Sequence, residues 1–369
     1  MNVSLTGGTG FVGGHVLRDL IGRGDTVRAV HRSPEGAEPL QALGAEPVRA
    51  DALDRAALRR AFKGSEIVFH VAGRVGSRPR KDVWEANALA PRIVVEAAAA
   101  EGVRRVVVTS SVAGVGPARP GEVADEDSPF RGGGLGLTYV DAKHEGETEA
   151  LAAGARCGIE VVTVNPSYVF GVPVDPAVPG ENSTRMIGNY LRGRLPGVVD
   201  ARSNFVDVGD VAAGHLAAAD RGEPGERYIL GGHNLGWVEL IERVRELSGV
   251  SHPLVVIPRE VAYATRVPDA LGLPSLISAE AYVLMAQEWT YSSAKARREL
   301  GYKARPLRET LKETVDWYLE LIDSGAFRGE APSRLSLASF GLRAGGPFSA
   351  ASALRLAQRR TRRQLVAGE

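Results

Sequence analysis

Tyr139 and Lys143 have the residue types and the spacing for proton transfer. A phenol and an ammonium four positions apart share one face of a helix. A tyrosine ordinarily has a pKa of about 10, and a nearby cation lowers that pKa by favouring the phenolate. Such a phenol can protonate a carbonyl oxygen during its reduction, or take a proton from an alcohol. The ordinary alternative is a solvated helix face.

Ser111 is the third candidate, at the end of the segment Thr109-Ser110-Ser111. A hydroxyl at the carboxyl end of a central strand faces a cofactor crevice and can bind the substrate oxygen. Ser110 is the alternative, and either hydroxyl could simply cap the strand end. We expect a catalytic group of Ser111, Tyr139 and Lys143, with Lys143 also holding ribose hydroxyls, and no metal site.

Gly7, Gly10 and Gly13 lie between an apolar run at residues 3–5 and a helical pattern at residues 13–23. In such a turn the first glycine relieves strain, the second admits a pyrophosphate, and the third lets the helix pack closely. The amides of the helix N-terminus then face the anion. An ordinary glycine-rich turn is the alternative. The residues expected to bind a dinucleotide here are Gly7, Thr9, Gly10, Phe11, Val12 and Gly13.

Arg32 and Ser33 follow the second expected strand, at residues 26–30, and bear on the choice of cofactor. A site for NAD(H) usually has an acid at this point, which binds the ribose 2′-hydroxyl. Here an arginine and a hydroxyl can bind a 2′-phosphate instead, which favours NADP(H) over NAD(H). Arg32 could also be a plain surface arginine. Asp51, followed by Ala52, can accept from the adenine amino group or cap the helix expected from Leu53.

Apolar strands and amphipathic helices alternate through the first half of the chain and would position these residues. Continuous apolar runs of this kind are typical of buried parallel strands. The order predicts an α/β fold, a doubly wound Rossmann sheet with a smaller, interleaved substrate domain. The expected strands are residues 3–5, 26–30, 66–71, 105–109 and 160–164, and the expected helices residues 13–23, 53–62, 87–101 and 139–155.

The second half is less regular, with prolines and glycines from residue 166 onward. Residues 204–211 and 227–230 look like strand pieces that return to the sheet, and residues 237–248, 292–300 and 307–321 like helices. We divide the chain into a dinucleotide-binding domain at residues 1–165, with returning elements near 204–232, and a substrate-binding domain at 166–325. Residues 326–369 form a tail rich in arginine, glycine and serine.

The composition narrows the class of protein. The 369 residues carry 45 basic and 44 acidic side chains, a net charge of +1, so nothing favours binding to nucleic acid. No apolar run is long enough to span a membrane. The single cysteine, Cys157, excludes an internal disulfide and suits a reducing cytoplasm. We expect Cys157 to be a buried, inert thiol.

Together these motifs resemble the extended short-chain dehydrogenase/reductase family over roughly residues 1–325. The resemblance implies that Val71, Ala72 and Gly73 lie along the dinucleotide and that Asn87 braces the central helix. It also implies that Thr109 belongs to the cofactor site and that Pro166, Ser167 and Tyr168 border the nicotinamide. Family members often form homodimers through a helix pair that would include residues 139–155. The remaining matches are the glycine turn, Asp51, Ser111, Tyr139, Lys143 and Asn165.

Two branches of the family fit. The stretch at residues 27–32 is similar to the dihydroflavonol-reductase-like ketone reductases, whereas residues 193–196, 210–215, 225–232 and 291–295 resemble sugar epimerases associated with hopanoid biosynthesis. Nucleotide-sugar enzymes usually carry a Gly-Asp-Gly segment that residues 198–206 lack, and Arg202 is not at their usual spacing. We therefore expect an NADPH-dependent ketone or aldehyde reductase. The alternatives are an epimerase or dehydratase that recycles its dinucleotide, and a cofactor-binding regulator. The substrate, a small molecule, would lie among residues 74–84, 114–137 and 172–190.

Overall fold

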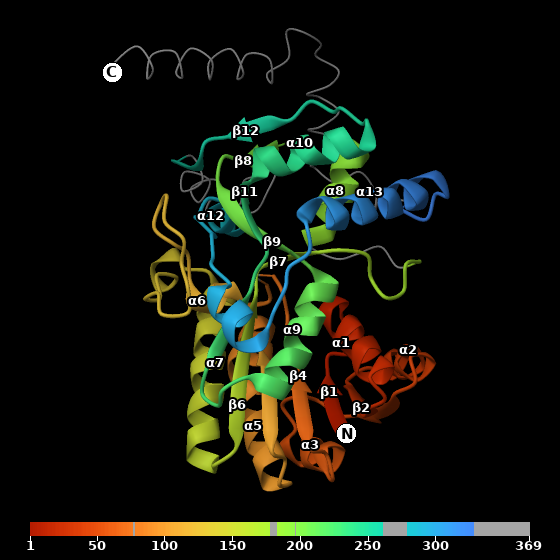
Figure 1. Ribbon diagram of the computed structural model, residues 1–369, viewed down its shortest axis with the longest axis vertical. Coiled ribbons are helices and arrows are strands. Elements are labelled where there is room, and N and C mark those ends of the chain that lie inside the picture. Colours follow the sequence, from red (N-terminus) through yellow and green to blue (C-terminus); the bar gives the residue numbers. More distant parts are fainter. Residues whose placement is uncertain (77, 178–182, 196, 261–278, 328–369) are drawn as a thin grey trace.

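Seven parallel strands form the central sheet of the computed structural model, in the order β10-β6-β5-β4-β1-β2-β3 (Figure 1). The structure describes residues 1–76, 78–177, 183–195, 197–260 and 279–327. The strand order reverses between β1 and β4, and ligands of such sheets bind at the carboxyl ends of the strands beside this point. The strands are β1 (Asn2–Thr6), β2 (Thr26–His31), β3 (Glu46–Arg49), β4 (Ile67–His70), β5 (Arg105–Thr109), β6 (Glu160–Pro166) and β10 (Arg227–Leu230).

Helices cover both faces of this sheet (Figure 1). On one face α1 (Phe11–Gly22) packs with α9 (Val208–Arg221), and Leu17 and Phe69 are buried in their shared core. On the other face Phe62 and Val106 lie in a second core beneath α3 (Arg55–Phe62), α5 (Ala90–Ala100) and α7 (Thr138–Cys157). Shorter elements are η1 (Pro34–Gly36), α2 (Ala37–Ala42), α4 (Arg80–Trp84), η2 (Glu85–Leu89), α6 (Val112–Val115) and η3 (Gly133–Leu135).

The remaining elements lie above the carboxyl ends of the sheet (Figure 1). Their core contains Phe170 stacked on Phe205, with ring centroids 5.4 Å apart, and Trp237 edge-on at 5.0 Å from Phe205. Three strands pair in the order β11-β9-β7, and β12 pairs with β8. The elements are β7 (Tyr168–Phe170), α8 (Ser183–Leu191), β8 (Gly197–Val199), β9 (Arg202–Asp207), β11 (His233–Gly236), α10 (Trp237–Ser248), β12 (Val255–Ile257), α12 (Ala279–Met285) and α13 (Leu307–Asp323). The exception is η5 (Ala296–Leu300), which packs against α9 and β10 beside the main sheet.

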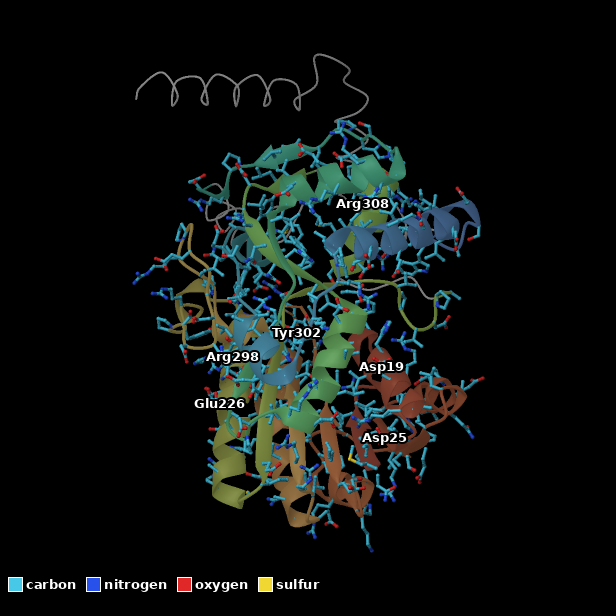
Figure 2. The ribbon with its side chains drawn as sticks, viewed as in Figure 1. Asp19, Asp25, Glu226, Arg298, Tyr302 and Arg308 are labelled. Carbon is cyan, nitrogen blue, oxygen red and sulfur yellow. The ribbon has the colours of Figure 1, made fainter. Side chains whose placement is uncertain are left out.

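Ion pairs join segments that are distant in the sequence. At the start of β1, the Asp25 carboxylate lies 2.8 Å from the Met1 ammonium and 2.6 Å from Arg23 Nε; Asp25 is labelled in Figure 2. Tyr302, also labelled there, is buried in the core that α1 and α9 share. The C-terminal segment therefore returns to the main sheet well beyond residue 232. None of the described helices is both long and apolar enough to cross a bilayer.

The predicted fold class is confirmed, with local corrections. The strand predicted at residues 204–211 is wrong in extent and in partner: β9 ends at Asp207 and pairs with β7 and β11 rather than with the main sheet. Asp207 ends the strand because its Oδ1 accepts from the Gly209 amide at 2.7 Å and caps α9. The segment 227–230 does return to the main sheet, as β10 beside β6.

Cys157 is a second correction, because the structure exposes the thiol that we expected to be buried. It is the last residue of α7, and Gly158 follows in the left-handed conformation with φ +68°, where the helix leaves the surface of the sheet. The domain boundary at residues 165 and 166 stays a prediction. Most of the predicted tail, from residue 328 onward, lies outside the described residues.

Candidate active site

The glycine turn joins β1 to α1 at the carboxyl edge of the sheet. Gly7 has φ +81°, which favours glycine, and a Cβ there would lie 2.5 Å from the Ala72 amide nitrogen. A Cβ on Gly13 would lie only 1.9 Å from the Gly7 carbonyl oxygen. Both positions therefore require glycine because backbone meets backbone, as the sequence pattern predicts.

The N-terminus of α1 is open toward this turn. Gly10 caps the helix without a side-chain hydrogen bond, and the first ladder bond runs from the Gly14 amide to the Gly10 carbonyl at 2.8 Å. The amides of Phe11, Val12 and Gly13 are therefore outside the helix ladder, at the positive end of its dipole. With Thr9 exposed beside them, these residues fit a pyrophosphate.

The segment after β4 runs between this turn and α7. The Ala72 amide donates to Thr6 Oγ1 at 3.3 Å, which fixes Val71 and Ala72 against the turn. A Cβ on Gly73 would lie 2.9 Å from Asn87 Oδ1 and 3.2 Å from Lys143 Nζ. Asn87 is buried, and its amide donates to the carbonyls of Arg74 at 2.8 Å and Val83 at 2.9 Å. Asn87 thus holds the turn from this segment into α5.

Arg32 and Ser33 are exposed directly after β2. Within the described part of the chain, Arg32 forms no ion pair. The pKa of Glu35 is lowered by hydrogen bonds from its own backbone amide and from the Ser33 hydroxyl, so Ser33 already has an acidic partner. Our sequence reasoning did not consider Glu35, because it lies beyond the strand end where an acid was sought.

Asp51 and Ala52 are half-buried in the loop between β3 and α3. The suggestion that Asp51 caps the next helix is wrong. Asp54 is the cap, since its Oδ1 accepts from the Ala57 amide at 3.0 Å and the helix begins at Arg55. Asp51 Oδ1 accepts from the Leu53 amide at 2.9 Å in a local turn, which leaves its other oxygen for a ligand.

Ser111, Tyr139 and Lys143 meet where β5 ends beside the start of α7. The Ser111 side chain lies near enough to the Tyr139 phenol to lower the pKa of that phenol, and its hydroxyl accepts from the Ala113 amide at 3.1 Å. Lys143 is buried, and its Nζ donates to the Thr109 carbonyl at 3.0 Å. Ser110 is buried with its Oγ unpaired, beside Gly114 and Glu147 near α7, so it lacks the contact with Tyr139. This geometry favours Ser111 over Ser110.

The pKa values of this group are set mainly by burial. Burial raises the pKa of Tyr139 above its ordinary value, and the hydrogen bond with Ser111 opposes that rise. Our expectation that Lys143 lowers the pKa of Tyr139 below its ordinary value is therefore wrong in this structure. Burial also lowers the pKa of Lys143, to about 8, and the Glu147 carboxylate opposes that shift. The ammonium is oriented toward the Thr109 carbonyl, and desolvation outweighs its field at the phenol.

Pro166, Ser167 and Tyr168 lie where β6 passes into β7. The Ser167 hydroxyl donates to Asn204 Oδ1 at 2.7 Å, and the Gly232 amide donates to the same oxygen at 2.7 Å. The Tyr168 ring packs edge-on against Trp237 at 4.9 Å, and burial raises the pKa of its phenol to about 12. This phenol therefore stays protonated and is a poor base.

Sequence reasoning missed several buried polar side chains around the site, among them His215 and His70, each of which pairs with a threonine. Thr109 Oγ1 lies 2.8 Å from His215 Nε2 on α9, and Thr6 Oγ1 lies 2.8 Å from His70 Nδ1. Asn204 and Glu147 are further buried polar residues that sequence reasoning missed. No local motif marks them, because their partners are distant in the sequence. Only the sheet register brings His70 opposite Thr6.

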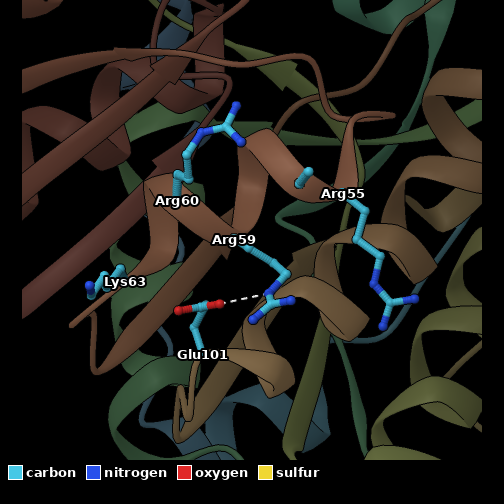
Figure 3. A pocket seen from close by; sticks show the side chains of 6 residues that line it. Arg55, Arg59, Arg60, Lys63 and Glu101 are labelled. Carbon is cyan, nitrogen blue, oxygen red and sulfur yellow. Dashed lines mark hydrogen bonds and ion pairs between the residues drawn. The ribbon is translucent and has the colours of Figure 1, made fainter.

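A surface hollow of about 510 Å³ on α3 is unrelated to this site (Figure 3). Arg59 Nε donates to Glu101 Oε1 at 2.7 Å, as Figure 3 shows, and Arg55 lies 3.3 Å from Glu96. Local acids therefore offset part of its charge, and we assign it no role. Its lining residues are Arg55, Ala56, Arg59, Arg60, Lys63 and Glu101.

Comparison with known proteins shows the family to which the chain is similar. Residues 3–231 match the model of the NAD dependent epimerase/dehydratase family. A Synechocystis sp. protein named "Putative dihydroflavonol 4-reductase" is 33% identical over 326 residues, covering 85% of this chain and 93% of that protein. Cinnamoyl-CoA reductase 1 from Oryza sativa subsp. japonica is 35% identical over 327 residues, covering 85% and 89%. A nucleoside-diphosphate-sugar epimerase from Pseudomonas aeruginosa superposes with a TM-score of 0.72 at 26% identity, covering 89% of this chain and 99% of that structure.

Proposed function

The chain belongs to the NAD-dependent epimerase/dehydratase family, and we propose that within it the protein reduces a ketone or aldehyde with NADPH. The observation that carries this proposal is the arrangement of Ser111, Tyr139 and Lys143 beside the glycine turn. It places a proton donor, a hydroxyl for the substrate oxygen and a buried cation at one edge of the sheet. Reduction of a carbonyl by a bound NAD(P)H can use all three groups.

When bound, NADPH would supply from nicotinamide C4 the hydride that reduces the carbonyl carbon. Ser111 donates a hydrogen bond to the carbonyl oxygen and holds it near Tyr139. As negative charge develops on this oxygen, the Tyr139 hydroxyl protonates it, and the product is an alcohol. Lys143 holds the ribose hydroxyls and stabilises the phenolate that remains on Tyr139. The raised pKa of Tyr139 keeps its hydroxyl protonated at neutral pH, so the proton is available for transfer.

The proposed preference for NADP(H) rests on Arg32. Its guanidinium is exposed after β2, where a ribose 2′-phosphate would lie, and a charged fork can bind that phosphate through two hydrogen bonds. Ser33 would add a hydroxyl by exchanging its contact with Glu35 for the phosphate.

We propose a largely apolar carbonyl compound as the substrate class. Tyr139 and Phe130 pack against a buried apolar cluster that includes Val112, Leu137 and Trp289. An apolar cluster beside the proton donor favours neutral aromatic or aliphatic groups over charged sugars. The names of two relatives, a dihydroflavonol reductase and a cinnamoyl-CoA reductase, indicate aromatic substrates for those proteins and support the same class here.

The alternative is an epimerase or dehydratase of sugars or nucleotide sugars, with an internally recycled dinucleotide. It is supported by the likeness to a nucleoside-diphosphate-sugar epimerase. Arg202 on β9 is a cation that could bind the nucleotide phosphates. The nearby Glu288 carboxylate, however, offsets part of its positive charge. Burial raises the pKa of Glu288, and Arg202 and Arg259 lower it. An arginine whose positive charge is partly offset by a nearby acid is a weaker phosphate ligand, which favours the reductase.

Dinucleotide exchange separates the two proposals. The protein is purified, denatured, and its released nucleotides are quantified; the native protein is then titrated with NADPH and with NADH. A reductase releases little nucleotide and binds added NADPH reversibly. Stoichiometric NAD retained through purification, with no binding of added NADPH, would refute the reductase proposal.

We also propose a homodimer in the cytoplasm. α5 and α7 lie side by side on one face of the sheet, and Arg92 on α5 lies 3.5 Å from Glu149 on α7. These two helices would face their copies in a four-helix contact. Light scattering should give twice the chain mass, and a chain mass at micromolar concentration would contradict the dimer.

A further inference from the structure

Glu147 is a buried acid on α7, the helix that carries Tyr139 and Lys143, and the proposed mechanism does not use it. Its side chain is about 1% exposed. Its Oε2 accepts from Asn165 Nδ2 at 2.6 Å, and Arg227 Nε lies 2.8 Å from its Oε1. A Cβ on Gly114 would lie 3.1 Å from Oε2, so α6 covers the carboxylate closely. Asn165 and Arg227 thus fix the position of this carboxylate inside the protein.

Glu147 lies one helical turn beyond Lys143 on the same face of α7. Lys143 is also buried, so little water screens one charge from the other. The other titratable groups near the ammonium are Tyr139 on α7 and His70 on β4. Burial and the Lys143 charge lower the pKa of His70 to about 3. His70 is therefore neutral and adds no charge beside the ammonium. Arg227 on β10 is the opposing cation, with its Nε 2.8 Å from Glu147 Oε1.

We propose that Glu147 is a positioning residue that keeps the Lys143 ammonium charged through its electrostatic field, while Arg227 limits that field. The buried Lys143 ammonium needs a negative charge nearby because water does not solvate it. Desolvation alone disfavours the ammonium, so without a nearby negative charge it would lose its proton closer to neutral pH. A neutral amine would hold the ribose hydroxyls less firmly and would not stabilise a phenolate on Tyr139. This inference rests on the proposed role of Lys143, but not on the identity of the substrate.

The test measures dinucleotide affinity against pH, which needs no turnover and therefore stands apart from the proposed reductase activity. The dissociation constant for NADPH is measured by fluorescence titration between pH 6.5 and 9.5. In the wild-type protein, affinity should fall above about pH 8, where Lys143 loses its proton. In Glu147→Gln, which keeps the shape and loses the charge, the fall should begin about one pH unit lower.

Two further variants separate an electrostatic role from a structural one. Arg227→Gln removes the opposing cation at the edge strand, and the fall in affinity should move to higher pH. Glu145→Gln makes the same isosteric change on the exposed face of α7 and should leave the curve unchanged. A wild-type curve in Glu147→Gln, or shifts of the same sign in both site variants, would overturn the proposal. If Glu147→Gln does not fold, the test rests on Arg227→Gln alone. An affinity curve for that variant that does not move to higher pH would then refute the proposal.

Discussion

Replacement of Gly13 by alanine tests the account of the glycine turn. The added Cβ would lie 1.9 Å from the Gly7 carbonyl oxygen and 2.6 Å from its carbon. Neither atom belongs to a flexible side chain, so α1 must move away from the turn. An ordinary contact begins near 3.4 Å, which requires a displacement of about 1.5 Å. The amides of Phe11 and Val12 move with the helix.

The cost follows from this displacement. Overpacking of a tight contact typically costs about 1–3 kcal/mol of stability. Displacement of the helix amides should also weaken dinucleotide binding by at least about tenfold, equivalent to about 1.4 kcal/mol. Gly22→Ala is the matched control, because it lies on the same helix and its Cβ would meet no atom within 4 Å. Alanine should stabilise that position by up to about 1 kcal/mol.

Urea unfolding and NADPH titration of both variants provide the measurements. We expect Gly13→Ala to lose both stability and affinity, and Gly22→Ala to keep its affinity and gain a little stability. Wild-type stability with affinity within twofold in Gly13→Ala would show that the turn tolerates a side chain. The close helix-to-turn packing would then not be needed for the site.

Two further predictions concern the cofactor and pH. Arg32→Ala should reduce the preference for NADPH over NADH by about tenfold or more, because a charged hydrogen-bonding partner of the 2′-phosphate is lost; an unchanged ratio of dissociation constants would refute the role of Arg32. Burial lowers the pKa of His215 to about 4, and burial with the Lys143 charge lowers that of His70 to about 3, so both take up protons more readily when unfolded. The stability that these two neutral histidines contribute is fully present above pH 6.5. Below pH 6.5, each histidine should cost up to about 1.4 kcal/mol of stability for every pH unit. Urea midpoints at pH 7.5, 6.0 and 5.0 measure this loss, which should be shallower in His215→Gln, and an unchanged slope in that variant would contradict it.

The parallel sheet and the glycine turn could be predicted because local sequence determines them. Buried parallel strands require continuous apolar runs, and β5 matches the predicted residues 105–109 without change. Close backbone approach requires glycine, so Gly7 and Gly13 were visible in the sequence. The phenol and ammonium of Tyr139 and Lys143 share a helix, and helical spacing alone brought them together.

What could not be predicted depends on distant contacts. β9 pairs with β7 because of packing above the sheet, which no local pattern shows. The strand β9 ends at Asp207 because this residue caps α9. Burial, which raises the pKa of Tyr139, comes from elements far along the chain and outweighs the neighbouring lysine. Glu147 looks in the sequence like any acid on a helix. Only the fold shows that Asn165 and Arg227 meet it in the interior.

The most direct test of the proposed reductase compares Tyr139→Phe with the wild-type protein in NADPH oxidation over a panel of aromatic and aliphatic carbonyl compounds. Tyr228→Phe is the control, since it removes a phenol hydroxyl that accepts from the Glu223 amide at 3.0 Å, beyond the end of α9 and away from the site. We predict that the wild-type protein and the control oxidise NADPH with at least one carbonyl compound. Tyr139→Phe should lose about 100-fold or more in kcat/KM while binding NADPH normally. Full activity in Tyr139→Phe would contradict the account.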